Sequence, residues 1–526
     1  MLAHQCSPRA SLLLLVALLL SIFVLTANRL HHGSPAPVGE NRPDAAGKDG
    51  QKQTPEKAKK PAYNYPPILE TDSDFCKQDL KFLRHKDLEL TENILYTRRC
   101  VKPVRTGDID RDVVANITDP LITGLTHIDL RSKCAAIIPP PCEPLHLPVP
   151  SAYPHERYPH LLFGIASTYE RIKDSLPVFA HWLANTGAQL VAVVSDADDS
   201  KLDLDLSALE AAYRRAGMLA TITAPKIKQG LPRKDTPPKT KPESPAPVEQ
   251  LHFLLIRDML ELATPQTQWL GVLDDDTFFP ALYPLAQELR RHDHKRPRWL
   301  GQLADNWISN KLWGYMAYGG AGVFLSMPLA RQLEPHLEEC VTETTIVSGD
   351  GMLKECVYAH TTTKLTLVDG LWQHDIKGDP SGFFESGRKT LSIHHWKSWY
   401  HAPVDKMAGI AAHCGDCFLQ RWRFGDDTLF TNGYSIGVYR DGLDGLDLER
   451  VEGTFDEVDE RYDFIYQPFR PRLGPDEKKS YRLVSVDNGV VRGEGKFRQA
   501  YVYRAPETEE GGPKAMDEVV ELVWEF

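Results

Sequence analysis

The pattern of apolar and polar positions becomes regular after residue 160, where it predicts alternating strands and helices. Short apolar runs indicate buried strands, and stretches with apolar residues at helical spacing lie between them. The predicted elements are strand 160–166, helix 169–184, strand 189–194, helix 206–216, strand 219–224, helix 251–262 and strand 269–273. Because consecutive parallel strands need crossover helices, this order predicts an α/β fold with a parallel sheet.

The pattern changes past about residue 421 to short runs of alternating apolar and polar residues. The clearest runs are 434–439, 481–486, 500–504 and 519–526. Alternation with a period of two is typical of half-buried antiparallel strands. We therefore expect a β-rich C-terminal region, 421–526, that follows the α/β domain at 151–420 as an antiparallel appendage with a binding or packing role.

The first 150 residues have a different organisation. Residues 10–27 form an uncharged apolar run just long enough to span a bilayer, after a short tail at 1–9. Residues 28–66 are rich in Pro, Gly, Lys and Gln, which is typical of a flexible stem, and residues 67–150 are expected to be a loop-rich segment stapled by cysteines. The apolar run predicts a signal anchor with the rest of the chain lumenal, and a cleaved signal peptide is the alternative.

Composition and charge agree with a protein of the secretory pathway. The chain has 526 residues, too many for one ordinary core, and a net charge of −11, which argues against a nucleic-acid partner. Asn116-Ile117-Thr118 is a glycosylation sequon. Beyond Cys6 an even number of cysteines remains, which predicts disulfides whose pairing the sequence leaves open: Cys76, Cys100, Cys134, Cys142, Cys340, Cys356, Cys414 and Cys417.

Three consecutive carboxylates, Asp274, Asp275 and Asp276, directly follow the apolar strand 269–273. Ligands in α/β sheets lie beyond the carboxyl ends of strands, and clustered carboxylates in apolar surroundings repel one another unless a cation joins them. Mg²⁺ and Mn²⁺ prefer oxygen ligands and commonly hold substrate phosphates. The sequence therefore favours a divalent-metal site with a nucleotide diphosphate, and a solvated turn is the alternative.

Further candidates follow along the chain. Gly319 and Gly320 precede an apolar strand and allow close approach of a ligand to the backbone, although glycine turns also serve packing. Asp350 stands at the start of a predicted helix that ends near His360, where an aspartate is usually only a cap.

Three histidines lie in a tryptophan-rich region after this helix. Lone histidines are mostly structural, but one of them can complete a metal site that begins with aspartate. They are His374, His394 and His395.

In this order the motifs resemble the Fringe-like branch of glycosyltransferase family 31, and WQHDIKGDPSG followed by SIHHW is similar to Fringe-related proteins of plants and fungi. The resemblance covers roughly residues 160–400. It implies a GT-A-type fold and an inverting, metal-dependent transferase that moves a sugar from a UDP-sugar to a glycan or glycoprotein hydroxyl, usually as a β1,3 linkage. It also implies a single-pass type II protein of the Golgi membrane with a lumenal catalytic domain.

The resemblance also implies roles for individual residues. Asp276 and His374 would bind Mn²⁺ or Mg²⁺, and Asp350 would be the catalytic base; His394 and His395 are a possible additional site. The family's Phe-His-Ser-His segment corresponds to Leu371–His374, which keeps only the second histidine. Residues expected to contact the nucleotide sugar are Ser167, Thr168, Arg171, Asp196, Asp274, Asp275, Gly319 and Gly320.

Two other classes of function remain open at this stage. A catalytically inactive Fringe-like fold would act as a lumenal glycan-binding or scaffold protein. A metal-dependent hydrolase or phosphatase would also use an aspartate cluster, but it needs further ligands that the sequence does not supply. Retention of Asp276, Asp350 and His374 at compatible spacing favours the transferase.

Overall fold

The computed structural model describes residues 80–107, 109–132, 142–199, 202–235, 241–456, 465–488, 496–506 and 515–526. The predicted tail, apolar run and stem all lie outside these ranges. Within the ranges, no helix combines the length and the apolar character needed to cross a membrane.

The first half of the α/β domain follows the sequence prediction closely. Its elements are β5 (Leu161–Ser167), α2 (Tyr169–Leu183), β6 (Gln189–Val194), α3 (Leu206–Arg215), β7 (Leu219–Thr223), α4 (Val248–Leu262) and β8 (Trp269–Val272). Strands β5, β6, β7 and β8 are parallel neighbours, as the alternation predicts. The mixed α/β class is confirmed.

The second half of this domain makes the sheet mixed. It contains α5 (Leu282–Arg290), β9 (Trp299–Gly301), α6 (Trp307–Trp313), β10 (Val323–Ser326), α7 (Met327–Leu333), η5 (Glu334–His336), α8 (Leu337–Glu343), α9 (Gly349–His360) and β11 (Leu365–Leu367). The order is β11-β9-β10-β8-β5-β6-β7, and β10 runs antiparallel to both β8 and β9. The predicted parallel arrangement therefore holds for β5 to β8, and β10 adds an antiparallel strand to the sheet.

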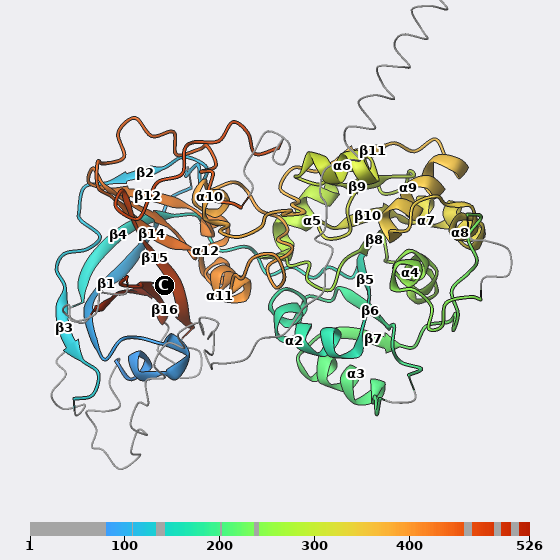
Figure 1. Ribbon diagram of the computed structural model, residues 1–526, viewed down its shortest axis with the longest axis horizontal. Coiled ribbons are helices and arrows are strands. Elements are labelled where there is room, and N and C mark those ends of the chain that lie inside the picture. Colours follow the sequence, from blue (N-terminus) through green and yellow to red (C-terminus); the bar gives the residue numbers. More distant parts are fainter. Residues whose placement is uncertain are drawn as a thin grey trace, which may run out of the picture. The chain divides into compact units, whose positions relative to one another are not determined.

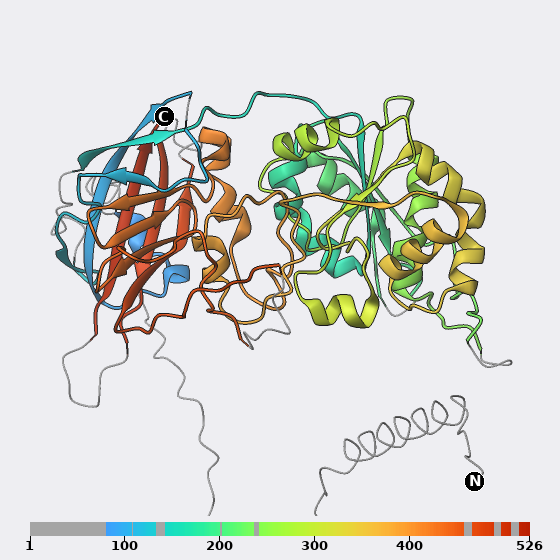
Figure 2. The same cartoon turned by 90° about the horizontal axis from the view of Figure 1, so that it is seen from above.

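Helices cover both faces of the seven-stranded sheet. One hydrophobic cluster joins the sheet to α4, α7, α8 and α9, and another joins its opposite face to α2, α3 and α5. Figure 2 shows the sheet nearly edge-on between these two helical layers. Both faces are buried, which explains why β5, β6 and β8 are continuous apolar runs rather than alternating ones.

The second sheet corrects the prediction for the N-terminal segment and the C-terminal region. Part of the segment 67–150, predicted to be loop-rich, forms strands: β1 (Asn93–Arg105) pairs in parallel with β17 (Asp517–Glu525) and with β4 (Glu143–Val149). Figure 1 shows β1 in blue beside the red C-terminal strands. The C-terminal region is thus completed by the segment before the α/β domain.

The remaining strands extend this second sheet in the order β2-β12-β13-β14-β15-β16-β17-β1-β3. They are β2 (Ala115–Ile117), β3 (Thr126–Asp129), β12 (Arg421–Phe424), β13 (Thr428–Thr431), β14 (Ser435–Tyr439), β15 (Lys478–Asp487) and β16 (Lys496–Tyr503). Two short 3-10 helices, η2 (Lys81–Arg84) and η3 (Lys86–Leu88), precede β1. The pairs from β12 to β17 are antiparallel, as their alternation predicts.

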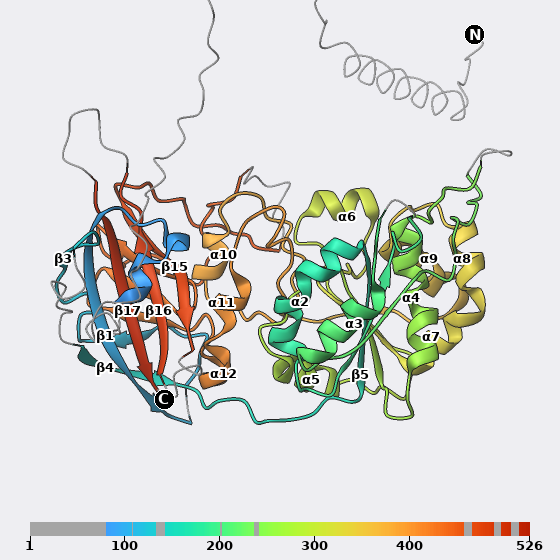
Figure 3. The same ribbon diagram turned by 90° about the horizontal axis from the view of Figure 1, so that it is seen from below.

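Three short helices connect the two sheets along the chain: α10 (Ser381–Glu385), α11 (Val404–Ala408) and α12 (Ala411–Cys414). Figure 3 shows them beside the ten-stranded sheet. Their apolar side chains belong to a cluster that also contains Phe163 of β5 and Trp524 of β17, so the two sheets share one continuous hydrophobic core.

Disulfides are confirmed for six of the predicted cysteines. The pairs are Cys100–Cys142, Cys340–Cys356 and Cys414–Cys417. Cys76 and Cys134 lie outside the described residues. The first bond ties β1 to the start of β4, and the second joins helix α8 to helix α9.

Candidate active site

The three aspartates leave the carboxyl end of β8 with different surroundings. The side chain of Asp274 is 38% exposed, whereas those of Asp275 and Asp276 are 4% and 6% exposed. Adjacent carboxylates therefore do not share one environment, and each has its own partner.

Asp275 is held by the start of α2. Arg171 donates two hydrogen bonds of 2.5 Å to its two carboxylate oxygens, and the Ser167 hydroxyl donates a third. A bidentate arginine and a hydroxyl satisfy a buried carboxylate well. Three predicted binding residues, Ser167, Arg171 and Asp275, thus contact one another at the ends of β5 and β8.

His394 lies between the other two aspartates. Its Nε2 is 3.0 Å from Asp276 Oδ1 and 3.3 Å from Asp274 Oδ2. Burial alone would lower the pKa of His394, but its hydrogen bonds to Asp274 and Asp276 raise it well above the usual range. In turn the pKa of Asp276 is lowered, because this imidazolium outweighs the effect of burial.

A second histidine, His252 on α4, also lies beside Asp274, and the sequence does not indicate this contact. Its Nε2 lies 3.3 Å from Asp274 Oδ1. Burial opposes the charged imidazolium, yet the hydrogen bond and charge of Asp274 raise the pKa of His252 to about 9. His252 follows an apolar helical pattern that also fits a core position, so only tertiary packing reveals its role.

Asp350 lies in the first turn of α9 but does not cap it. The cap is Ser348, whose hydroxyl accepts a hydrogen bond from the Gly351 N–H. Asp350 Oδ2 accepts a hydrogen bond of 2.9 Å from the Gly319 N–H, and Oδ1 has no hydrogen-bond partner in the described structure. Burial raises the pKa of Asp350 to about 6 against the lowering charge of His252, and the charge of Asp274 adds to the rise.

Gly319 and Gly320 are required by the side chains around them. A Cβ on Gly320 would lie 2.2 Å from the His394 ring. A Cβ on Gly319 would lie 3.0 Å from Asp274 Oδ1 and 3.1 Å from Asp350 Oδ1. The close approach predicted for these glycines therefore exists, and it brings Asp274, Asp350 and His394 to one stretch of backbone.

One group in this cluster fits a divalent cation. Ligand atoms of Asp276, His394 and His395 all lie within 4.8 Å of one another. His395 has a left-handed backbone (φ 57°), its ring stacks on Trp399 at 3.9 Å, and its Nε2 is 3.4 Å from Asp375 Oδ1. Two imidazoles and a carboxylate are a donor set suited to Mn²⁺ and related metals.

The expected second ligand, His374, lies elsewhere. Its fully buried ring packs on aromatic side chains, including Phe383 at 4.5 Å, and its Nδ1 is 3.2 Å from the Tyr400 hydroxyl. Burial lowers the pKa of His374 well below its usual value. His374 is not in the group of potential ligands that Asp276 forms, and that group contains His394 and His395 instead.

Two further residues predicted to contact the nucleotide sugar lie at the start of α2 or bind it. Asp196 accepts a hydrogen bond of 2.8 Å from the Tyr169 N–H at the start of α2, and Thr168 occupies the cap position of that helix without a side-chain cap bond. Far from these, Asn116 of the sequon is exposed on β2.

Part of the chain matches a known family model. Residues 309–404 match a family model described as "Protein of unknown function, DUF604", and no curated protein matches the chain. This matched stretch contains Asp350, His394 and His395.

Several solved glycosyltransferases resemble the chain weakly. Mouse xyloside xylosyltransferase 1 has 10% identity and a TM-score of 0.26, and it covers 40% of this chain and 85% of its own. The galactosyltransferase LgtC also has 10% identity and a TM-score of 0.26, with 47% and 81% covered. For GlyE of Streptococcus pneumoniae TIGR4 the identity is 10%, the TM-score 0.27 and the coverage 49% and 60%. At these TM-scores the likenesses carry no argument.

Proposed function

We propose that the protein is an inverting, metal-dependent glycosyltransferase that moves a sugar from a UDP-sugar to a hydroxyl of a glycan or glycoprotein. The observation that carries this proposal is the placement of Asp350. A carboxylate with one unpartnered oxygen and a raised pKa lies beside a three-residue group suited to a divalent cation. A carboxylate that can accept a proton, beside a group that can hold a cation, suits displacement of a nucleotide diphosphate by a hydroxyl.

The roles of the side chains follow from their surroundings. Asp350 Oδ1 accepts the proton of the attacking hydroxyl, while the Gly319 N–H fixes the other oxygen. Asp276, His394 and His395 would hold Mn²⁺ or Mg²⁺, which would neutralise the charge of the diphosphate leaving group. His252, at a pKa of about 9, orients Asp274 as a cationic partner.

Arg171 and Asp275 have a positioning role in this proposal. Their ion pair fixes the start of α2 against the end of β8, where a nucleotide would lie in an α/β sheet. The Arg171 side chain is 57% exposed, so its charge also remains accessible to a ligand.

The family-model match supports the coarser assignment. DUF604 groups proteins that resemble β1,3-glycosyltransferases of family 31. The UDP donor, the β1,3 linkage and the GT-A-type fold assignment come from the sequence resemblance and are parts of the proposal. So is the location, a type II protein of the Golgi membrane, and the disulfides suit such an oxidising compartment.

A donor panel tests the proposal. Incubation of the full chain with Mn²⁺ and individual UDP-sugars is expected to release UDP with at least one donor, faster when an acceptor glycan is present. Asp276→Ala should abolish the release, and Asp199→Ala, a surface aspartate after β6, should not. If no donor is turned over while metal and UDP still bind, the chain is the inactive glycan-binding alternative.

A further inference from the structure

A second group of potential metal ligands lies on the outer helices of the α/β domain. It consists of His336 at the end of η5, Glu339 on α8 and His360 at the end of α9. The ligand atoms of the three side chains all lie within 4.8 Å of one another. His336 Nδ1 is 3.2 Å from Glu339 Oε2, and His360 Nε2 is 4.0 Å from the same oxygen.

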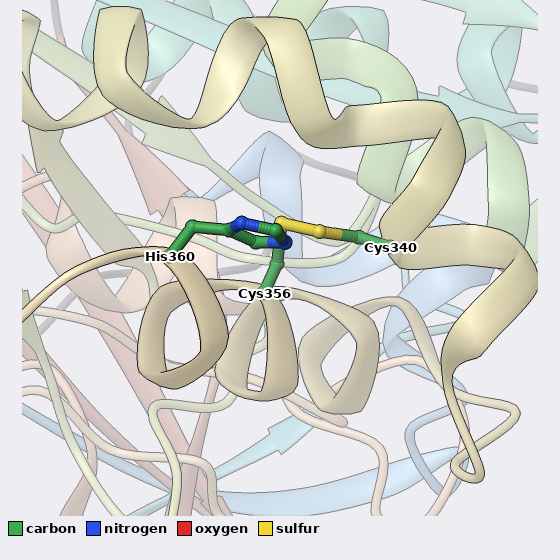
Figure 4. A group of neighbouring side chains, drawn as sticks. All are labelled: Cys340, Cys356 and His360. Carbon is green, nitrogen blue, oxygen red and sulfur yellow. A yellow bond between two sulfur atoms is a disulfide. The ribbon is translucent and has the colours of Figure 1, made fainter.

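A disulfide holds the two helices that carry the group. Cys340, next to Glu339, is bonded to Cys356, one helical turn before His360. Figure 4 shows His360 beside this disulfide. Because the two sulfur atoms are bonded to each other, they are not thiolate ligands, and the disulfide instead fixes the separation between Glu339 and His360.

The group is open to solvent, and its ligand atoms lie near the spacing that a metal requires. The side chains of His336, Glu339 and His360 are 37%, 59% and 20% exposed. Tetrahedral zinc with bonds of about 2.0–2.2 Å places its ligand atoms about 3.3–3.5 Å apart. The His336–Glu339 distance of 3.2 Å is close to this spacing, and His360, at 4.0 Å from Glu339, must move closer to become the third ligand.

The relative orientation of the His336 and His360 rings determines which side chain must move when a metal binds. Their rings stack at 3.8 Å with an interplanar angle of 14°. Lone pairs of parallel rings do not converge, so one ring must tilt toward the other when a metal binds. Both side chains reach solvent on one side, which leaves room for this tilt and for water as a fourth ligand.

We propose that His336, Glu339 and His360 form a site for Zn²⁺ or a similar transition metal, separate from the Asp276 group. Two imidazole nitrogens and one carboxylate oxygen are typical zinc ligands. A bound ion would link the end of α9 to η5 and α8 and stabilise this helical layer. This proposal does not rest on the proposed transferase activity.

Metal titration of the full chain tests the proposal. In an His394→Ala background, which weakens the Asp276 group, Zn²⁺ is expected to bind with one remaining site at micromolar or lower concentration by calorimetry. Adding His360→Ala should weaken this binding at least about 100-fold, and Glu339→Gln at least about tenfold, because each removes a direct ligand. Zn²⁺ should raise the Tm of the parent and not that of the double variant.

The chain offers a matched control on α5. His292 Nε2 lies 3.6 Å from Glu288 Oε1, and among the described residues this partly buried pair belongs to no group of three potential ligands. His292→Ala should leave the Zn²⁺ affinity unchanged. The proposal is overturned if His360→Ala and its parent bind Zn²⁺ equally, if His292→Ala loses as much affinity, or if binding needs millimolar metal.

Discussion

Two clusters of charged side chains among the described residues differ in how their charges are balanced. At the end of β8, four carboxylates (Asp274, Asp275, Asp276 and Asp350) lie near Arg171, His252 and His394. The positive charge of the two histidines depends on bound protons. In the second cluster, Lys478 and Arg482 of β15 and the nearby Arg470 form ion pairs with Glu385 and Glu452. Lysine and arginine stay positively charged at neutral pH. The charge balance of the first cluster therefore depends on the protonation of its histidines, and that of the second does not.

The second cluster pairs each buried carboxylate with more than one cation. Lys478 Nζ is 2.8 Å from Glu452 and also contacts Glu385, and all three side chains are at most 4% exposed. Burial would raise the pKa of Glu385, but Lys478 and Arg482 lower it to about 2. By contrast, Asp350 keeps a raised pKa and an unpartnered oxygen. The two clusters thus differ in the pKa of their carboxyl groups, which is raised for Asp350 and lowered for Glu385.

The largest expected effect is on turnover in the first cluster. Asp350→Asn should lower kcat by about 10²–10⁴-fold, because the amide cannot accept the proton. Its free energy of unfolding at pH 7.5 should not fall, since the raised pKa means that the charged form is disfavoured in the folded state. The stability contributed by Asp350 is present below its unfolded pKa and is lost as the pH rises through about 6.

Asp205→Asn is a matched control for this variant. Asp205 caps α3, where its side chain accepts a hydrogen bond of 2.8 Å from the Ala208 N–H, and asparagine caps equally well. Initial rates with saturating donor should be normal for Asp205→Asn. Equal losses in the two variants would show that Asp350 has only a structural role.

The second cluster should respond in stability instead. Lys478→Met leaves two buried carboxylates without their shared cation and should lower the free energy of unfolding by about 3–5 kcal/mol. The neighbouring Lys479 is 33% exposed and paired with Glu518. Lys479→Met should lower the free energy of unfolding by less than about 1 kcal/mol. Denaturant unfolding measures both. Loss of metal binding without loss of stability in Lys478→Met would contradict the distinction between the clusters.

A smaller effect concerns pH. Because the pKa of Asp350 is raised to about 6, kcat at saturating Mn²⁺ should be level above pH 7 and fall about tenfold per pH unit well below 6. A pH–rate profile of the wild type measures this directly. A rate that stays level down to pH 5 would exclude Asp350 as the base.

Most of the α/β domain could be predicted from the sequence because its signals are local. The apolar runs of β5, β6 and β8 and the helical spacing of α4 depend only on neighbouring residues. The pairing of β1 with β17 could not be predicted, since it joins the two ends of the described chain. The antiparallel direction of β10 likewise depends on tertiary contacts.

The candidate site, too, could be predicted from the sequence only in part. Asp276, Asp350 and the glycines were identifiable from residue types and order, but the choice among the histidines was not. His374 and His395 both adopt left-handed backbone conformations (φ 52° and 57°), which redirect their rings in ways that spacing does not reveal. His252 comes from a preceding helix and reaches Asp274 only through the packing of α4 on the sheet.

The most direct test of the central claim, that Asp276 and His394 hold the cation, is Mn²⁺ binding followed by electron paramagnetic resonance. On the full chain at pH 7.5, His394→Ala should weaken binding at least about 100-fold, because it removes a direct ligand. His374→Phe, which keeps an aromatic ring among Phe383, Phe384 and Tyr400, should leave the affinity unchanged. Normal binding by His394→Ala together with loss in His374→Phe would contradict the account.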